Sequence, residues 1–333
     1  MADAPGALLL RLHSLGDVVL ASAAARHLVA THGRCCFLTD EQNLPVLARM
    51  GRGVEPIGRA GTGSGMKALR IAMGRARSGG CAGAVFDLQG NLTTLLALWP
   101  SRAQARLRTD RAARRALLRK GSSGSRARLP YRAAEFLRLV GGEGSALPCL
   151  ERPRSDASTK DPGRPAIGIV TDGRWPLKTI PAGVVAELTR IYVDLAGARV
   201  KLIGSPGVER EASIAGIGRD GVEKARPSSV AELMETVSSL DLLVSPDSGP
   251  AHLACAMEVP VLVFFSSTAP ALGFWLEDPA GYPGRVAYWM VDGLDCRPCH
   301  RHGGTACRRG GAALCRSAIV PLALARASME LLG

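Results

Sequence analysis

The chain has 333 residues, enough for about two domains, and 47% of them are hydrophobic, which is ample for a buried core. The formal net charge of +13 favours an anionic partner. No window approaches the ~20 apolar residues of a membrane span, and Arg11, His13 and Asp17 interrupt the apolar N-terminus, which is atypical of a signal peptide, so we expect a cytoplasmic protein.

Most of the excess positive charge lies in one stretch. Residues 102–138 contain twelve Lys or Arg residues against two acidic ones, Asp110 and Glu135, a net charge of +10. Such a stretch predicts either a solvated helix face or a patch for an anionic partner: nucleic acid, an acidic membrane face or an acidic glycolipid. Few aromatic residues interleave these arginines, which argues against single-stranded nucleic acid.

The first half of the chain alternates apolar runs with helical patterns. An apolar run over 7–12 predicts a buried strand, and the loop ending at Gly16 and Asp17 leads into a predicted helix over 18–30. Asp17 therefore lies at a helix start, where it is either a plain helix-start acid or a general base that faces a cleft. The further predicted strands cover 34–39 and 82–88.

Between these strands, residues 58–65 are glycine-rich but lack the Lys-Ser/Thr ending of a phosphate-binding P-loop, so we expect a flexible loop. A helix is predicted over 130–140. The polar, proline-containing segment 151–165 is the predicted linker between two domains.

The second half repeats the alternation of strand, loop and helix. Strands are expected over 166–170 and 199–203, with helices over 181–195 and 230–239. We predict an N-terminal Rossmann-like domain over 1–155, a C-terminal one over 156–316, and a C-terminal helix within 317–333 that packs back on the N-terminal domain.

The segment 241–265 carries the densest chemistry of the second half. An apolar run ends at Asp247, Ser248 and Gly249, a helical stretch with His252 follows, and a second apolar run covers 259–265. Asp247 and Ser248 are favoured N-cap residues, and the first N–H groups of the helix would bind an anion. The alternative is a capped helix with a surface histidine.

Five motifs follow one another along the chain: Leu10-Arg-Leu-His-Ser-Leu-Gly-Asp17, Asp87-Leu-Gln-Gly90, Trp175-Pro-Leu-Lys178, Gly204-Ser-Pro-Gly-Val-Glu209, and Asp247-Ser-Gly-Pro-Ala-His-Leu-Ala254 with Val259-Pro260. Together they resemble the motifs of glycosyltransferase family 9, the bacterial heptosyltransferases. The resemblance implies a GT-B fold, an α/β architecture of two Rossmann-like domains that face each other across a cleft.

The resemblance also implies an inverting transfer of heptose from an ADP-sugar to a lipopolysaccharide inner-core hydroxyl. Asp17 would be the general base for the acceptor hydroxyl, and Ser14 and Gly16 would lie beside that acceptor. Lys178 would offset the charge on the leaving diphosphate. The remaining substrate-binding residues implied by the family are Thr171, Glu209, Asp247, Ser248, Gly249 and His252.

No Asp-x-Asp pair is present to hold a divalent metal on the diphosphate, so no cofactor is expected for catalysis. A lysine and a helix N-terminus would do that work instead. The chain departs from the family pattern at Ser266-Ser-Thr268, where a glycine usually precedes the threonine, and at Lys178-Thr-Ile-Pro181. These differences concern the donor sugar more than the type of reaction.

Four of the nine cysteines cluster near the C-terminus. Cys296, Cys299, Cys307 and Cys315 begin with a Cys-x-x-Cys knuckle typical of a four-sulfur zinc or iron site, and His300 and His302 are substitute ligands. Free thiols or oxidised pairs are the alternatives. We expect this C-terminal cysteine finger to be structural and distant from the transfer chemistry. The five other cysteines are interpreted as small core or surface residues. A cytoplasmic location argues against structural disulfides.

The leading hypothesis is therefore a metal-independent heptosyltransferase that uses an ADP-sugar donor and an acidic glycolipid acceptor at the inner membrane face. The alternatives are a transferase of the same fold with another donor or a protein or glycan acceptor, a basic metal-knuckle protein that binds nucleic acid, and an inactive homologue. No nucleic-acid partner is expected in the leading hypothesis, and the sequence indicates no particular oligomeric state.

Overall fold

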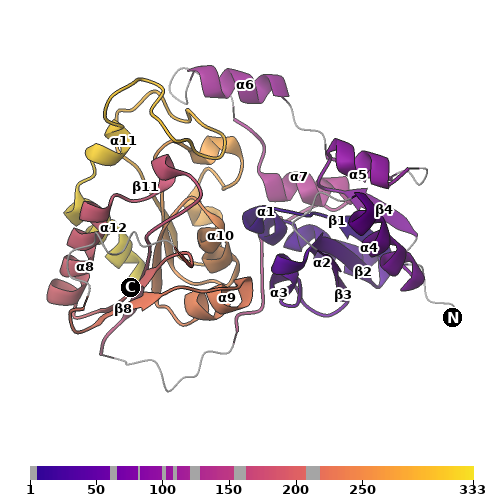
Figure 1. Cartoon of the computed structure of the whole chain (residues 1–333), viewed down its shortest axis with the longest axis horizontal. Helices are drawn as coiled ribbons and strands as arrows, with labels where there is room; N and C mark the ends of the chain where they lie inside the picture. The colour runs from indigo at the N-terminus through magenta and orange to yellow at the C-terminus, as the bar shows by residue number, and fades with distance from the viewer. Residues whose placement is uncertain are drawn as a thin grey trace. The chain divides into compact units, whose positions relative to one another are not determined.

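A computed structural model describes residues 6–60, 66–81, 83–99, 103–107, 111–120, 128–153, 163–207 and 218–333. The chain divides into two units, each with its own parallel sheet (Figure 1). The N-terminal unit comprises Met1–Thr109 and Pro130–Arg152, and the C-terminal unit comprises Asp110–Leu129 and Pro153–Gly333. No helix in the described ranges is long and apolar enough to cross a membrane.

The sheet of the N-terminal unit has the order β3-β2-β1-β4-β5, and every pairing is parallel. Its strands are β1 (Ala7–Leu10), β2 (Cys35–Asp40), β3 (Val54–Arg59), β4 (Ala84–Asp87) and β5 (Ala105–Arg106). All four residues of β1 are buried, as expected for a central strand covered on both faces. The chain reverses direction across the sheet between β1 and β4, which makes the carboxyl ends of these two strands the topological switch point.

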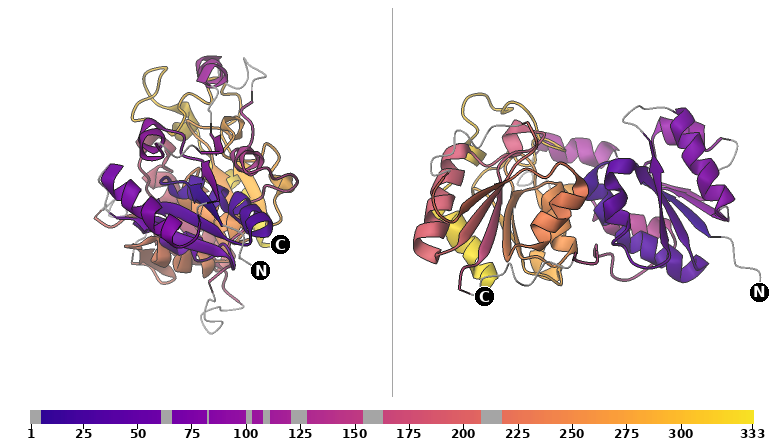
Figure 2. Two further views of the ribbon diagram at one scale, coloured as in Figure 1. Left: turned by 90° about the vertical axis from the view of Figure 1, so that its right-hand side faces the viewer. Right: turned by 60° about the horizontal axis from the view of Figure 1, so that its bottom comes forward.

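Helices cover both faces of this sheet (Figure 2). They are α1 (Leu15–Leu20), α2 (Ser22–His32), α3 (Leu44–Leu47), α4 (Met66–Ser78), α5 (Leu92–Ala97) and α7 (Arg132–Leu139). Apolar side chains of α4 and α5 share one core with Leu8, Leu10 and Leu38 of the strands. The other face carries α2, against which α7 packs.

The sheet of the C-terminal unit has the order β11-β10-β9-β6-β7-β8 and is also parallel throughout. Its strands are β6 (Ala166–Val170), β7 (Arg199–Ile203), β8 (Val222–Ala225), β9 (Leu242–Pro246), β10 (Val261–Phe264) and β11 (Val286–Trp289). Its helices include α6 (Arg111–Lys120), α8 (Ala182–Ala196), α9 (Val230–Ser238), α10 (Gly249–Ala256) and α11 (Leu314–Ser317). The switch point of this sheet lies between β6 and β9.

The last helix, α12 (Pro321–Met329), belongs to the core of the C-terminal unit. Leu324 and Ala325 are fully buried in the same cluster as Ile191, and the hydroxyl of Tyr192 on α8 lies 2.6 Å from that of Ser328. This differs from the expectation that the helix packs on the N-terminal domain. Its apolar face is already used against α8 and the sheet.

Candidate functional site

The candidate residues of the N-terminal unit gather at the switch point of its sheet. The chain leaves β1 through Leu12 and reaches α1 at Leu15, and it leaves β4 through residues 88–91. Hydrogen bonds join the two loops: Arg11 Nη1 donates to the Leu88 carbonyl at 2.8 Å, and the Leu12 N–H donates to Gln89 Oε1 at 3.2 Å. Loops at this edge are where open parallel sheets bind ligands.

Asp17 lies in the first turn of α1 and is almost completely buried. Arg11 Nη2 lies 2.5 Å from Asp17 Oδ2, and the Ser14 hydroxyl donates to the same oxygen at 2.9 Å. Ser14 is the N-cap residue of α1 by its backbone, but its side chain makes no cap hydrogen bond. Within the described ranges, the side-chain hydrogen bonds from Arg11 and Ser14 to Asp17 both go to Oδ2.

The charge state of Asp17 follows from these neighbours. Burial alone would raise the pKa of this carboxyl, but the guanidinium groups of Arg11 and Arg132 and the Ser14 hydroxyl outweigh it and hold the pKa below its usual value. Asp17 is therefore ionised at neutral pH.

The arginines around Asp17 were not predicted from the sequence. Arg132 belongs to the buried face of α7, together with Ala133, Phe136 and Leu137, and the Arg11 guanidinium lies 5.7 Å from the Phe136 ring centroid. The signal was present, because an arginine at a buried position of an amphipathic helix needs a charged partner.

The candidate residues of the C-terminal unit gather around Asp247, directly after β9. Lys178 Nζ lies 3.0 Å from Asp247 Oδ2, to which the Thr268 hydroxyl also donates at 2.8 Å. The indole Nε1 of Trp275 donates to Asp247 Oδ1 at 2.8 Å. Lys178 ends a short 3₁₀ turn, Pro176–Lys178, in the loop that follows β6, so the pair spans the switch point of this sheet.

The Asp247 carboxylate is strongly stabilised. Burial would raise its pKa, but the Lys178 ammonium, His252 and the two hydrogen-bond donors together lower the pKa to about 2. The imidazole of His252 stacks on Trp275 with ring centroids 4.2 Å apart. The sequence placed Asp247 and His252 at this edge, whereas Thr268 was noted only as a departure from the family pattern and Trp275 was not noted at all.

Helix α10 begins at Gly249 with Ser248 as its N-cap residue. The Ser248 hydroxyl donates to the Pro246 carbonyl at 3.0 Å, and no side-chain cap hydrogen bond is made to the helix. Asp247 likewise binds Lys178 and Trp275 instead of capping. Ser248 therefore takes the predicted N-cap position, but neither side chain makes the cap hydrogen bond that was expected.

Two further residues of this unit, Thr171 and Glu209, were predicted to bind the substrate. The Thr171 hydroxyl is buried at the end of β6 and donates to the Ile203 carbonyl at 3.1 Å. Next to it, Asp172 accepts hydrogen bonds from the backbone N–H and hydroxyl of Ser205. Glu209 lies outside the described residues.

The cysteine finger packs directly against the Lys178 segment. The backbone N–H groups of Cys299 and His300 both donate to the Ser267 carbonyl, and the Leu177 N–H donates to the Gly304 carbonyl at 3.0 Å. A Cβ at Gly303 would lie 2.7 Å from Cδ of Lys178. The finger was expected to be distant from the transfer chemistry, but it lies beside Lys178, one of the residues predicted for that chemistry.

The four finger cysteines are unpaired, and Cys315 is buried. Burial and the nearby Cys296, Cys315 and Cys307 raise the pKa of Cys299 to about 11, so the thiols influence one another. A tetrahedral four-thiolate zinc site has sulfurs about 3.8 Å apart. These four do not form a cluster with three ligand atoms within 4.8 Å of one another, and the arrangement is more open than a closed metal site.

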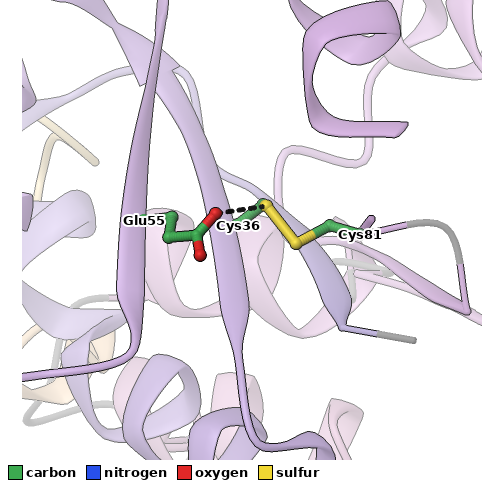
Figure 3. A group of neighbouring side chains, drawn as sticks. All are labelled: Cys36, Glu55 and Cys81. Carbon is green, nitrogen blue, oxygen red and sulfur yellow. Dashed lines mark hydrogen bonds between the residues drawn. A yellow bond between two sulfur atoms is a disulfide. The ribbon is translucent and has the colours of Figure 1, made fainter. Parts of the chain in front are cut away.

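In the N-terminal unit, the potential ligand atoms of Cys36, Glu55 and Cys81 all lie within 4.8 Å of one another. Figure 3 shows these three side chains. Cys36 and Cys81 form a disulfide, which corrects the expectation that the chain has no structural disulfides. A Cβ at Gly6 would lie 3.0 Å from Cys81 Sγ, so this glycine leaves room for the bridge beside β1. Cys36 Sγ lies 3.5 Å from Glu55 Oε2, a hydrogen bond only in the thiol form, because a disulfide sulfur has no proton to donate.

Comparison with known proteins agrees with the family recognised from the motifs. The model of glycosyltransferase family 9 (heptosyltransferase) matches residues 143–276, which contain Lys178 and Asp247. Lipopolysaccharide heptosyltransferase 1 of Pseudomonas aeruginosa is 30% identical over 149 residues, which cover 44% of this chain and 39% of that protein. The aligned part is therefore less than half of the relative's length.

Two solved structures resemble the structure of this protein over nearly its whole length. The E. coli ADP-heptose lipopolysaccharide heptosyltransferase II has a TM-score of 0.70 at 17% identity and covers 98% of each chain. The iron-containing dodecameric glycosyltransferase TibC of enterotoxigenic E. coli has a TM-score of 0.60 at 14% identity, over 99% of this chain and 76% of that one. The predicted fold class, GT-B with two Rossmann-like units, is confirmed.

Proposed function

We propose that this chain belongs to glycosyltransferase family 9 and transfers a heptose from an ADP-sugar to a hydroxyl of the lipopolysaccharide inner core, with inversion at the anomeric carbon. The observation that supports this most is the family match over residues 143–276, which includes the buried Lys178–Asp247 pair at the switch point of its sheet. Ligands of open parallel sheets bind at that position.

In the proposed reaction, Asp17 is the general base. Its Oδ1 takes the proton of the acceptor hydroxyl while the hydroxyl oxygen forms a bond to the anomeric carbon. The bond between that carbon and the diphosphate oxygen breaks, and its electron pair leaves with ADP. Arg11 keeps the carboxylate ionised and holds it through Oδ2, so the other oxygen stays directed to the substrate.

Lys178 is the proposed electrophilic group for the leaving diphosphate. An ammonium has three donors, and one of them is used by Asp247. The other two would bind phosphate oxygens, and the uncapped start of α10 would add backbone N–H groups. Asp247 then positions Lys178, while Ser248, Gly249 and His252 line the same helix start. Thr171 and Glu209 remain proposed substrate contacts.

The four cysteines of the finger are the proposed ligands of a structural metal ion, iron or zinc, that takes no part in the transfer. The support is the presence of four unpaired cysteines within residues 296–315, a segment that packs on Lys178, together with the iron content of TibC, which has the same fold. A bound metal would draw the sulfurs closer and would hold the Leu177–Lys178 backbone against Gly304. Elemental analysis of the purified protein measures this directly.

The function is tested by incubating the protein with ADP-heptose and a Kdo-containing acceptor and detecting the heptosylated product by mass spectrometry. Asp17→Asn is expected to lower kcat by about 10²–10⁴-fold with donor affinity retained. Asp40→Asn is the matched control, because Asp40 is another partly buried, arginine-paired carboxylate of the same unit.

Ligand-induced thermal stabilisation identifies the donor independently of the acceptor. Selective stabilisation by ADP over UDP, GDP and CDP is expected and grows with concentration. Stabilisation by UDP or GDP alone would exclude the ADP-sugar, and full transfer by Asp17→Asn would exclude the proposed base.

A further inference from the structure

An apolar stripe covers the outer face of α5. Leu92, Leu95, Leu96 and Trp99 are 67, 43, 45 and 71% exposed. Their spacing of three, four and seven residues places them on one side of the helix. Thr94, Ala97 and Leu98, on the other side, are buried against the sheet. The helix therefore has two apolar faces, of which the fold uses one.

The neighbouring helix extends this surface. α4 packs beside α5, and Arg70 of α4 donates to the Leu96 carbonyl at 3.5 Å. Met66 and Ile71 of α4 are also exposed. Ten large hydrophobic residues are exposed in the described ranges, and six of them lie on these two helices or at their ends. Single exposed apolar residues are normal, but a cluster marks an interaction surface.

The exposed side of α4 is basic. Lys67, Arg70, Arg75 and Arg77 are exposed along it. The one acidic residue in the sequence between 66 and 99 is Asp87, which is fully buried and pairs with Arg106. The surface formed by the outer sides of α4 and α5, here named the α4–α5 face, is thus apolar with a rim of a single positive sign.

We propose that the α4–α5 face docks on an anionic lipid bilayer. Apolar side chains of this kind enter the boundary between headgroups and acyl chains, while Lys and Arg stay with the anionic headgroups. Trp99 is the residue type enriched at that depth. Charge complementarity favours a bilayer over a second copy of the chain, because a symmetric contact would bring the same arginines together.

The face lies close to Asp17 within the N-terminal unit. α5 starts directly after residues 88–91, the loop that hydrogen-bonds to Arg11 and Leu12 beside Asp17. A bilayer at the α4–α5 face would present a lipid-linked hydroxyl to this edge of the sheet. The docking proposal itself rests on the surface alone and does not require the proposed transfer activity.

Vesicle flotation of the full chain tests the docking. Vesicles of phosphatidylcholine alone are compared with vesicles that also contain phosphatidylglycerol, at low and high salt. Wild-type protein is expected to bind the anionic vesicles at least tenfold more strongly, and less at high salt, since the basic rim is screened. Lipid should also shift the fluorescence of the exposed Trp99 to the blue, and Trp99→Leu should remove that shift.

The decisive variant replaces Leu92, Leu96 and Trp99 with serine, and it should reduce vesicle binding at least tenfold. Its matched control replaces three exposed apolar residues of the C-terminal unit, Leu195, Val320 and Leu322, with serine and should bind as wild type. These side chains are exposed, so both variants should unfold at the wild-type temperature. Equal binding by both variants, or no wild-type binding to anionic vesicles, would overturn the proposal.

Two further measurements separate the other interpretations. Size-exclusion chromatography compares the oligomeric state of the wild type with that of the variant that carries serine at residues 92, 96 and 99. A wild-type oligomer that is lost in the variant would assign the α4–α5 face to a second copy of the chain and would overturn the proposal of bilayer docking. Transfer to a soluble, deacylated acceptor should be unchanged in this variant. Vesicle binding without any transfer would refute the proposed function and leave the docking surface intact.

Discussion

Replacing Lys178 with methionine removes one partner of the buried ion pair at the candidate donor site. Lys178 Nζ lies 3.0 Å from Asp247 Oδ2, and the two side chains are 15 and 8% exposed. Methionine keeps most of the apolar stem but carries no charge. Asp247 would then stay buried with two neutral donors, the Thr268 hydroxyl and the Trp275 indole.

The size of the effect follows from the distance and the pKa. Unit charges 3.0 Å apart attract by about 5.5 kcal/mol at an effective dielectric constant of ~20, before the cost of desolvation. The lowered pKa of Asp247, about 2 against 3.8, corresponds to about 2 kcal/mol of net stabilisation. We therefore expect Lys178→Met to lower the free energy of unfolding of the C-terminal unit by about 2–4 kcal/mol at pH 7.

The pH dependence of this loss has a defined sign. A carboxyl with a lowered folded-state pKa contributes its full stabilisation above its ordinary value of 3.8, and the contribution disappears as the pH falls towards 2. In Lys178→Met, the burial that raises the pKa is no longer opposed by the ammonium. The difference in unfolding free energy between wild type and variant should therefore be largest near neutral pH and should narrow as the pH falls and the carboxyl becomes protonated.

Urea unfolding across this pH range, followed by tryptophan fluorescence, measures the difference. Lys201→Met is the matched control, because Lys201 lies 3.7 Å from Glu223 in a more exposed pair worth less than about 1 kcal/mol. A double-mutant cycle with Asp247→Asn isolates the coupling. Equal, pH-independent losses in Lys178→Met and Lys201→Met would refute the assigned role of the ion pair.

Two further predictions concern the other parts of the site. Arg11→Met removes a charge that lowers the pKa of Asp17, so the acidic limb of the pH profile of kcat/KM should move to higher pH. The control Arg34→Met, which removes the partner of Glu55, should leave this limb in place. An unchanged acidic limb in Arg11→Met would contradict the link between Arg11 and the proposed base. Cys299→Ser should weaken ADP binding, measured by calorimetry, because the finger contacts Lys178. The control Cys149→Ser changes an exposed cysteine and should leave the affinity for ADP unchanged. Equal ADP affinities of the two variants would show that the finger does not contribute to ADP binding.

Much of the fold could be predicted because both sheets are parallel and centrally buried. Continuous apolar runs at β1, β6, β9 and β10 indicated strands directly, and the loops after β1 and β9 carry Asp17 and Asp247. Edge strands gave weaker signals. β3 contains Pro56 and Gly58, which are unfavourable inside a strand, and β8 has the mostly polar sequence Val-Glu-Lys-Ala. Neither strand was predicted.

The partners of the charged residues could not be read from local patterns. Arg132 is separated from Asp17 by more than a hundred residues, and only the packing of α7 brings its charge near α1. The same holds for the Cys36–Cys81 disulfide, which joins β2 to the segment before β4. Pairings of this kind depend on how elements far apart in the chain pack against one another, which the composition of each element does not determine.

The error about the cysteine finger has a single structural cause, the unpredicted strand β11. β11 pairs with β10 in parallel, and the Phe265 N–H donates to the Trp289 carbonyl at 2.9 Å. In a parallel sheet every strand ends at the same edge, so the segment after β11 begins at the edge where Asp247 and Lys178 lie. The segment 290–304 therefore begins at the same edge of the sheet as Asp247 and Lys178. In an all-parallel sheet, each segment that follows a strand belongs among the candidates for the site, however far along the chain it occurs.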